Sequence, residues 1–250
     1  MVYFYRTLIL IGCFLLGYLF GSIPNSVIIS KIFYHKDPRD YGSHNPGGTN
    51  VGRSISKGAG VATMALDFFK VIIPFLSIFA LFTYFKPAAQ LMLGDDLTYN
   101  IFGQGNTLAE LTYYLVALGC MFGHAYSCFL GFKGGKIVST FAGFILATSW
   151  TAIPIFAAIF FICLKKTKIV SITSIITTGC ITLFSWIVYI VFATCGPTIS
   201  GYLMFSEFGP HVSIYLPVFF SIGYVLLVFK HRGNLIKLKK GEENKIHWMK

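Results

Sequence analysis

Three polar segments that contain glycine interrupt the apolar pattern of this chain, and they hold most of the residues suited to chemistry. The first spans Gly42–Arg53 and reads Gly-Ser-His-Asn-Pro-Gly-Gly-Thr-Asn-Val-Gly-Arg. Glycines let backbone N–H groups turn toward one anion, and Arg53 can bind phosphate through its planar guanidinium. Further hydrogen-bonding side chains are Ser43, Asn45, Thr49 and Asn50. The segment fits a phosphate site, although a flexible solvated loop has the same composition.

The second segment, Phe132–Lys136, has one lysine on each side of Gly134 and Gly135, and it lies directly before an apolar stretch. The upstream glycine of a P-loop and its preceding strand are missing, so a nucleotide triphosphatase is rejected. A basic anchor beside the membrane is the simpler alternative, but two glycines suit a close approach of backbone to phosphate.

The third segment, His231–Glu243, is basic and follows the last apolar stretch. His231 and Asn234 are three residues apart, so they point the same way if the preceding helix continues. A solvated tail with no partner is the alternative for this segment. The three segments together predict a site for two or more phosphate groups at one membrane face.

The composition is that of a membrane protein. Hydrophobic residues make up 55% of the 250 residues and charged residues only 12%, whereas soluble domains carry about 25% charged residues. Crossing a bilayer takes roughly 20 apolar residues per helix. We therefore expect an all-α, polytopic integral membrane protein that forms a single domain over residues 1–250, without internal repeats.

About seven transmembrane helices are expected, within a range of five to seven. The first spans Tyr3–Phe33 with an irregularity at Gly21–Pro24, and we interpret it as a retained helix rather than a cleaved signal peptide. The others are Val61–Phe85, Leu111–Phe132, Ile137–Ser149, a short helix from near Pro154 to Leu164, Ile169–Ala193 and Val212–Phe229. Polar linkers are expected at Tyr34–Gly60, Lys86–Glu110 and Thr194–His211.

The basic residues lie between the apolar runs, which is why the net charge of +11 does not indicate nucleic acid. With seven helices, the positive-inside rule places the N-terminus outside and all three polar segments, with the C-terminus, in the cytoplasm. Arg6 is the one basic residue that disagrees. The C-terminal tail would attract anionic lipid headgroups.

Three polar groups fall inside apolar stretches. Asp67 and Lys70 are spaced to pair on one helix face, and such a pair can be structural or catalytic. His124 can line the site, but we favour a structural histidine. The six cysteines have no metal-binding or disulfide spacing and are interpreted as small buried residues. No metal and no cofactor are expected.

One motif is interpreted as a chance match. His35 and Asp40 have the spacing of acyl-CoA-dependent glycerolipid acyltransferases, in which histidine is the base and aspartate orients it. No later phosphate motif of that family follows, and the expected topology differs.

Considered together, the motifs resemble the bacterial acyl-phosphate:glycerol-3-phosphate acyltransferases over nearly the whole chain and in the same order. The matching residues are Gly21–Pro24, Gly42–Arg53, Leu66-Asp67 with Lys70, Gly123-His124, Phe132–Lys136, Ser171, Ser174, His231-Arg232, Asn234, Gly241 and Glu243. Three positions depart from the pattern. His44 and Ile137 stand where the family usually has glycine, and Ser139 where it has alanine.

The resemblance implies an all-helical enzyme of the cell membrane whose active site lies at the cytoplasmic face. Its substrates would be glycerol-3-phosphate, acylated at position 1, and a fatty acyl phosphate, and its product would be lysophosphatidic acid for phospholipid synthesis. By resemblance, Ser43, Arg53 and Lys136 bind the phosphate of glycerol-3-phosphate. The loop that binds the donor phosphate would contain Asn45, Gly47, Thr49 and Asn50. The remaining site residues would be Gly134, Gly135, Ser174, His231 and Asn234, and Glu243 would support them.

The residue types suit this reaction. An acyl phosphate is already an activated mixed anhydride, so no covalent nucleophile is needed, and none is evident. Two other functions remain to be compared with it: a transporter of a phosphorylated metabolite, which should place polar residues at the midplane of paired halves, and a lipid-binding scaffold. The sequence leaves the oligomeric state and the acyl-chain preference open.

Overall fold

A computed structural model describes residues 2–93, 107–195 and 213–246. All regular elements within these ranges are helices. The described residues belong to two compact units. Among the described residues, the first unit contains 2–93 and 107–147, and the second contains 148–195 and 213–246. The expectation of one domain stays a prediction, and each unit is described separately below.

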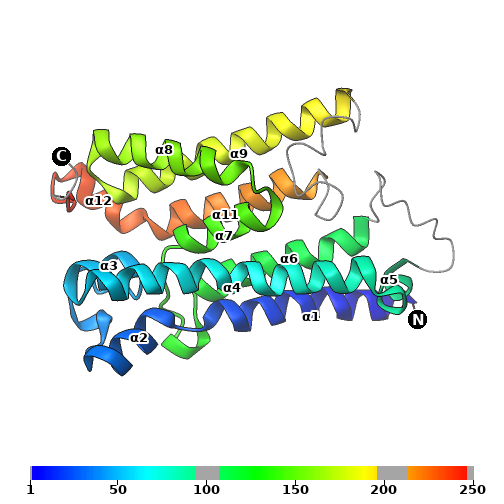
Figure 1. The fold of residues 1–250 in the computed structure, drawn as a ribbon, viewed down its shortest axis with the longest axis horizontal. Helices are drawn as coiled ribbons and strands as arrows, with labels where there is room; N and C mark the ends of the chain where they lie inside the picture. Colours follow the sequence, from blue (N-terminus) through cyan, green and yellow to red (C-terminus); the bar gives the residue numbers. More distant parts are fainter. Residues whose placement is uncertain (1, 94–106, 196–212, 247–250) are drawn as a thin grey trace. The chain divides into compact units, whose positions relative to one another are not determined.

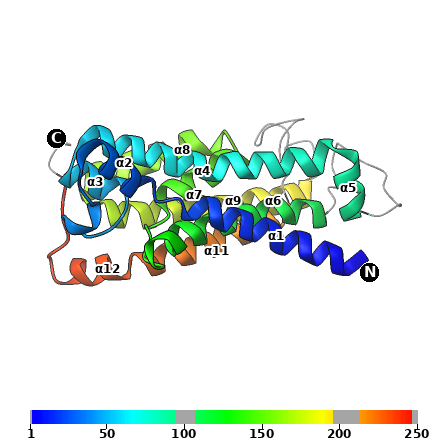
Figure 2. The same cartoon turned by 90° about the horizontal axis from the view of Figure 1, so that it is seen from below.

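The first unit is built from three long helices and several short ones (Figure 1). Its elements are α1 (Val2–Ser22), α2 (Asn25–Tyr34), η1 (Pro38–Asp40), α3 (Gly48–Ser54), α4 (Lys57–Tyr84), α5 (Lys86–Leu93), α6 (Thr107–Ala125), η2 (Cys128–Leu130) and α7 (Val138–Thr148). The long helices α1, α4 and α6 contact one another. Figure 2 shows the same helices turned by 90°.

The break between α1 and α2 confirms the predicted irregularity. Proline lacks an N–H group, so Pro24 cannot continue the hydrogen bonding of α1, and α2 begins at Asn25. Side chains from α4 and from the segment after α6 satisfy the carbonyls at the break. The hydroxyl of Ser127 donates to the Ser22 carbonyl at 2.5 Å, and the ammonium of Lys70 donates to the Ile23 carbonyl at 3.2 Å.

Glycines bring α1 and α6 into backbone contact along parallel directions. A Cβ atom at Gly17 would overlap the Val116 carbonyl, and one at Gly119 would overlap the Phe14 carbonyl. Gly21 and Gly123 face Cys120 and Tyr18 in the same way. This reciprocal small-xxx-small pattern is a common device for packing membrane helices closely. It fixes the end of α6 beside the break after α1.

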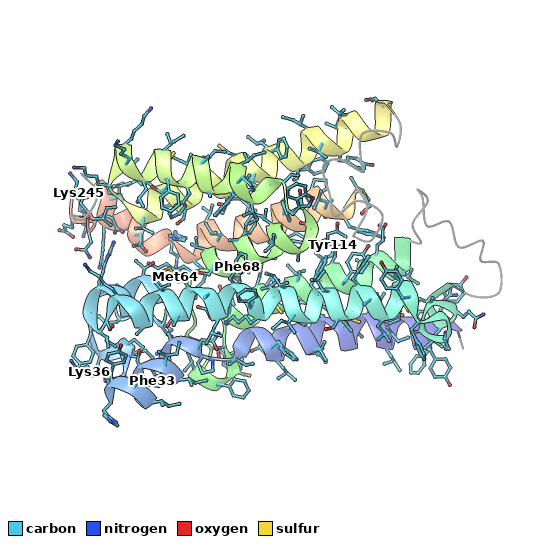
Figure 3. All side chains as sticks on the ribbon, in the orientation of Figure 1. Phe33, Lys36, Met64, Phe68, Tyr114 and Lys245 are labelled. Atoms are coloured by element: carbon cyan, nitrogen blue, oxygen red, sulfur yellow. The ribbon has the colours of Figure 1, made fainter. Side chains whose placement is uncertain are left out.

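Aromatic rings fill the unit farther along α4. Phe75 packs edge-on against Tyr113 and Tyr114 of α6, at centroid separations of 5.1 and 6.0 Å, and tilted against Phe144 of α7. Tyr114 is fully buried in this cluster (Figure 3). Because these side chains are large and apolar, they hold α4, α6 and α7 together.

The second unit contains α8 (Ala152–Thr167), α9 (Val170–Cys195), α11 (Tyr215–Lys230) and α12 (Arg232–Lys239). Lys168 adopts a left-handed conformation between α8 and α9, which form an antiparallel pair. The Trp186 indole N–H of α9 donates to the Ser221 hydroxyl of α11 at 3.1 Å. The Ile246 N–H donates to the Lys168 carbonyl at 2.7 Å, which ties the chain after α12 to the α8–α9 turn.

Four stretches among the described residues are long and apolar enough to cross a membrane: Tyr3–Tyr34, Lys57–Tyr84, Leu108–Leu130 and Val170–Val191. Val138–Thr148 and Tyr215–Lys230 are shorter apolar helices. The count of seven spans and the orientation of the termini stay predictions. The expected linker Lys86–Glu110 is wrong where α5 and the first turn of α6 occupy it, and residues 94–106 lie outside the described ranges. The linker Thr194–His211 and Val212 are also mostly outside them.

Candidate functional site

The segments Gly42–Arg53 and Phe132–Lys136 are called the first and the second loop below. The first loop is organised around the side chain of Asn50, which lies on α3 and is buried. Its amide oxygen accepts from the Ser43 N–H at 2.9 Å and from the Ser54 hydroxyl at 3.3 Å. Its amide nitrogen donates to the carbonyls of Pro38 and Tyr41 at 2.7 and 3.0 Å. All the hydrogen-bonding capacity of the amide group is thereby used to hold the loop against α3.

Two residues of this loop have positive φ angles. Gly42 has φ +60° and His44 has φ +57°. The His44 ring stays close to the loop, with Nδ1 2.9 Å from the Arg39 carbonyl oxygen. Left-handed backbone favours glycine because it has no Cβ. This explains why the departure at His44 is unusual: a side chain occupies a position whose backbone suits glycine.

A carboxylate braces the start of the loop. Asp37 is bound by Arg39 through both carboxylate oxygens, at 3.0 and 2.7 Å, and Lys31 lies 3.3 Å away. The hydrogen bonds from the Arg39 guanidinium hold the pKa of the Asp37 carboxyl well below its usual range. Because Asp37 precedes η1, this ion pair fixes the turn that leads from α2 into the loop.

The other predicted residues of the loop lie in α3 or just before it. Ser43, Thr49 and Arg53 are exposed, and Asn45 is half-buried. Gly47 is the residue before α3 and has extended backbone angles. The second half of the segment Gly42–Arg53 therefore folds into α3, a helix that was not predicted, while α4 begins later, at Lys57.

The second loop packs against the end of α6 through its glycines. The N–H groups of Gly134 and Gly135 donate to the carbonyls of Ala125 and His124 at 3.1 and 2.8 Å. A Cβ at Gly134 would overlap the His124 carbonyl, and a Cβ at Gly135 would overlap the His124 ring. These contacts provide a packing reason for the two glycines that the sequence had not suggested. Lys136 follows them and is half-buried.

The first two loops meet at one end of the first unit. A small polar cavity there is bordered by Pro46 of the first loop and by Gly134 and Gly135 of the second. The α1–α2 break forms another wall. One residue of the first segment and two of the second thus border the same cavity, but Ser43, Arg53 and Lys136 are not among its lining residues. The convergence of the three segments on a phosphate site stays a prediction.

The predicted Asp67–Lys70 pair is present beside this cavity. Lys70 Nζ lies 3.0 Å from Asp67 Oδ1, and both side chains are buried. Asn25 also donates to Asp67 Oδ1 at 3.0 Å, and His124 Nδ1 lies 2.9 Å from Lys70 Nζ. Asn25 and Ser127 were missed in the sequence. Their signal would have been polar side chains just after an apolar stretch ends or breaks.

The third predicted segment belongs to the second unit, where a carboxylate joins two of its members. Glu243 Oε1 accepts from the Asn234 amide at 2.7 Å and from the Ser171 hydroxyl at 3.0 Å. The glutamate therefore orients Asn234 on α12 and ties the tail to α9. Ser174 is buried, and its hydroxyl donates to the Val170 carbonyl of its own helix at 2.8 Å.

His231 separates α11 from α12 and is buried. Its Nδ1 lies 2.8 Å from the Leu227 carbonyl oxygen. Since a carbonyl only accepts, Nδ1 carries a proton, and Nε2 of the neutral ring is an acceptor. The helix is thus interrupted at His231, so the condition under which His231 and Asn234 would point the same way is not met.

The acyl-CoA-type motif and metal sites find no support among the described residues. His35 and Asp40 are both exposed, and His35 ends α2 in a left-handed conformation. The described ranges contain no group of three or more His, Cys, Asp or Glu residues that could hold a metal ion.

Residues 11–241 match the family described as glycerol-3-phosphate acyltransferase. The glycerol-3-phosphate acyltransferase of Staphylococcus carnosus is 36% identical over 235 residues, covering 94% of this chain and 96% of the relative. That of Staphylococcus aureus strain Newman is 33% identical, covering 97% and 100%.

Among solved structures, the chain is similar to PlsY (YgiH), an integral membrane glycerol 3-phosphate acyltransferase. The glycerol 3-phosphate form has a TM-score of 0.69 and 25% identity, covering 95% of this chain and 96% of that chain. The lysophosphatidic acid form has a TM-score of 0.68 and 24% identity, covering 95% of each chain. The transporter interpretation is therefore not favoured, and the chain belongs to the glycerol-3-phosphate acyltransferase family.

Proposed function

We propose that this protein transfers a fatty acyl group from an acyl phosphate to the position 1 hydroxyl of glycerol-3-phosphate. The products are 1-acyl-glycerol-3-phosphate, which is lysophosphatidic acid, and inorganic phosphate. The observation that carries the proposal is the family match over residues 11–241. The small cavity bordered by Pro46 of the first loop and by Gly134 and Gly135 of the second supports it, because it brings parts of both segments to one end of the first unit.

In this proposal side chains from both loops bind the acceptor substrate. Ser43, Arg53 and Lys136 hold the phosphate of glycerol-3-phosphate. The donor phosphate is held by Asn45, Gly47 and Thr49. Gly134 and Gly135, whose N–H groups already donate to carbonyls at the end of α6, contribute to substrate binding by placing the second loop. Asn50 acts on the donor through the loop that it organises.

The proposal also assigns roles in acyl transfer to Ser174, His231 and Asn234, which lie in the second unit. Glu243 supports this group by orienting Asn234. A carboxylate repels phosphate, which favours a supporting role over direct contact.

The chemistry needs orientation more than an enzyme nucleophile. The acceptor hydroxyl oxygen forms a bond to the acyl carbon, and the bond from that carbon to the phosphate oxygen breaks. The leaving phosphate takes the hydroxyl proton, so the reaction requires no protein base. If replacing His231 removed a titration from the pH–rate profile that belonged to a protein base, this assignment of the proton would be wrong.

The enzyme is placed in the cell membrane with about seven spans, the N-terminus outside and the loops at the cytoplasmic face. The positive-inside distribution of lysines and arginines supports this orientation. A lipid-soluble donor could then reach the site from the inner leaflet, while glycerol-3-phosphate arrives from the cytoplasm.

A donor-exchange assay tests the proposal. The protein purified in detergent is given glycerol-3-phosphate with either palmitoyl phosphate or palmitoyl-CoA, and lysophosphatidic acid is measured. Product from palmitoyl phosphate alone is expected, and Arg53→Ala or Lys136→Ala should abolish it while leaving the helix content unchanged. Product from palmitoyl-CoA would refute the donor assignment, and no product from either donor would refute the activity.

A further inference from the structure

Lys70 of α4 is the centre of a buried hydrogen-bonded group that lies outside both loops. Its ammonium is 3.0 Å from Asp67 Oδ1, 3.2 Å from the Ile23 carbonyl oxygen and 2.9 Å from His124 Nδ1. Three acceptors match the three N–H donors of an ammonium. The side chains of Lys70 and Asp67 are only 6% and 5% exposed. Lys70 therefore joins α4 to the α1–α2 break and to the end of α6.

The contact with His124 sets the orientation of the imidazole. A lysine ammonium can only donate, so Nδ1 of His124 accepts and the neutral ring carries its proton on Nε2. That Nε2 edge lies against Gly135, where even a methyl group would overlap it. The backbone of His124 also accepts from the Gly135 N–H at 2.8 Å. The position of the second loop thus depends on how His124 is held.

The contact with Asp67 reaches the first loop. Asn25, the first residue of α2, donates to Asp67 Oδ1, and α2 leads directly into that loop. Asp67, Lys70 and His124 border the same cavity as Pro46. The buried group of Asp67, Lys70 and His124 therefore borders the same cavity as residues of both loops.

We propose that Lys70, with Asp67 and His124, is a positioning residue for acyl transfer, which holds the Lys133–Lys136 segment so that the Lys136 ammonium meets the phosphate of glycerol-3-phosphate. The inference rests on the proposed function, because it uses the assignment of Lys136 to that phosphate. An ion pair that only stabilised the helices would leave substrate affinity unchanged after a neutral replacement. A positioning group changes the affinity for one substrate without a matching loss of folding.

The test removes the charges as a pair. Asp67→Asn combined with Lys70→Met leaves no unpaired buried charge, so the variant should fold, but it gives His124 no ammonium donor. His124→Asn keeps an amide oxygen as an acceptor for Lys70 yet does not reach Gly135. Thr63→Val is the matched control, because this buried hydroxyl on α4 donates only within its own helix, to Ala59.

The readouts are the KM for each substrate, kcat, the thermal midpoint in detergent, and hydrogen exchange of residues 133–137. We expect the charge-neutral pair and His124→Asn to raise the KM for glycerol-3-phosphate about tenfold or more, with faster exchange in that segment. The KM for acyl phosphate should change by less than about twofold. Thr63→Val should match the wild type throughout.

Wild-type kinetics and unchanged exchange in the folded variants would overturn the inference. If the charge-neutral pair does not accumulate, His124→Asn decides by the same criteria. If the wild type itself makes no lysophosphatidic acid, the proposed function fails. The exchange of residues 133–137 in the variants then still shows whether the buried group holds the loop.

Discussion

Replacing Asn50 by aspartate should disable the enzyme by loosening the first loop rather than by removing a contact with substrate. The change keeps the size of the side chain and the oxygen that accepts from Ser43 and Ser54. It converts the nitrogen that donates to Pro38 and Tyr41 into a carboxylate oxygen, which would face two carbonyl oxygens at 2.7 and 3.0 Å. Two favourable contacts become repulsive ones.

The magnitude follows from the burial of these bonds. The bond to Pro38 is buried and the bond to Tyr41 is partly buried. Leaving a buried acceptor unsatisfied costs about 1–3 kcal/mol, and a partly buried bond contributes about 1 kcal/mol. A total of about 3 kcal/mol corresponds to roughly a hundredfold loss of the ordered loop. We expect kcat/KM to fall by about that factor while the helices stay folded.

The assay combines acyl transfer with hydrogen exchange of residues 38–54. Ser54→Ala serves as the control, because it removes only the longest of the four bonds to the amide, and it should cost less than about threefold in kcat/KM. If Asn50→Asp lost activity while the exchange of the loop stayed as in the wild type, Asn50 would act on substrate directly and the reasoning would be refuted.

Three further outcomes are expected. Gly135→Ala should lower kcat/KM about a hundredfold, because its methyl group would displace the His124 ring. Gly12→Ala is the control and should behave as wild type, because there is open space around the added methyl group. Equal activity of the two variants would contradict the packing argument. The pKa of Asp37 is depressed in the folded protein. The stability that the ionised carboxylate gives to the loop is therefore fully present above about pH 4, the usual pKa range of aspartate. It is lost only as the pH falls through the lower pKa of the folded state. The difference in loop proteolysis between wild type and Asp37→Asn should therefore be constant from neutral pH to about pH 5 and shrink in stronger acid, and a change near neutral pH would contradict it. Glu243→Gln, which keeps an accepting oxygen, should retain clearly more acyl transfer and tail protection from proteolysis than Glu243→Ala, and equal losses would show that the carboxylate charge matters more than the hydrogen bonds.

The long apolar runs were sufficient to predict the main helices, because burial in lipid requires a continuous apolar stretch. The break before Asn25 could be predicted from Pro24, because proline lacks the N–H group that a continuous helix needs. The short helices α3, α5 and α12 were not predicted. Each has at most eight residues, and helices of that length depend on tertiary contacts rather than on local sequence.

The features of the site that depend on local spacing could be predicted, whereas those that depend on contacts between distant segments could not. The spacing of Asp67 and Lys70 was enough to expect their ion pair, since three residues separate neighbours on one helix face. The roles of Asn50 and Gly135 depend on segments far apart in the chain, and no local pattern reveals them. The same holds for Ile137, which departs from the family glycine at a position with φ +71°. Backbone conformation explains the usual glycine there, but it becomes visible only in the folded chain.

The interlocking glycines of α1 and α6 have a consequence for how this sequence can change over time. Each added residue turns a helix by about 100°. An insertion or deletion between Gly17 and Gly21, or between Gly119 and Gly123, would swing one glycine of the pair into the lipid even if the new residue were perfectly apolar. Apolar substitutions at Leu19 and Phe20, which are exposed between Gly17 and Gly21, carry no such penalty. Cys120 and Met121, between Gly119 and Gly123, are fully buried and do not share this freedom. The length of both stretches should therefore stay constant, while composition should drift mainly at Leu19 and Phe20.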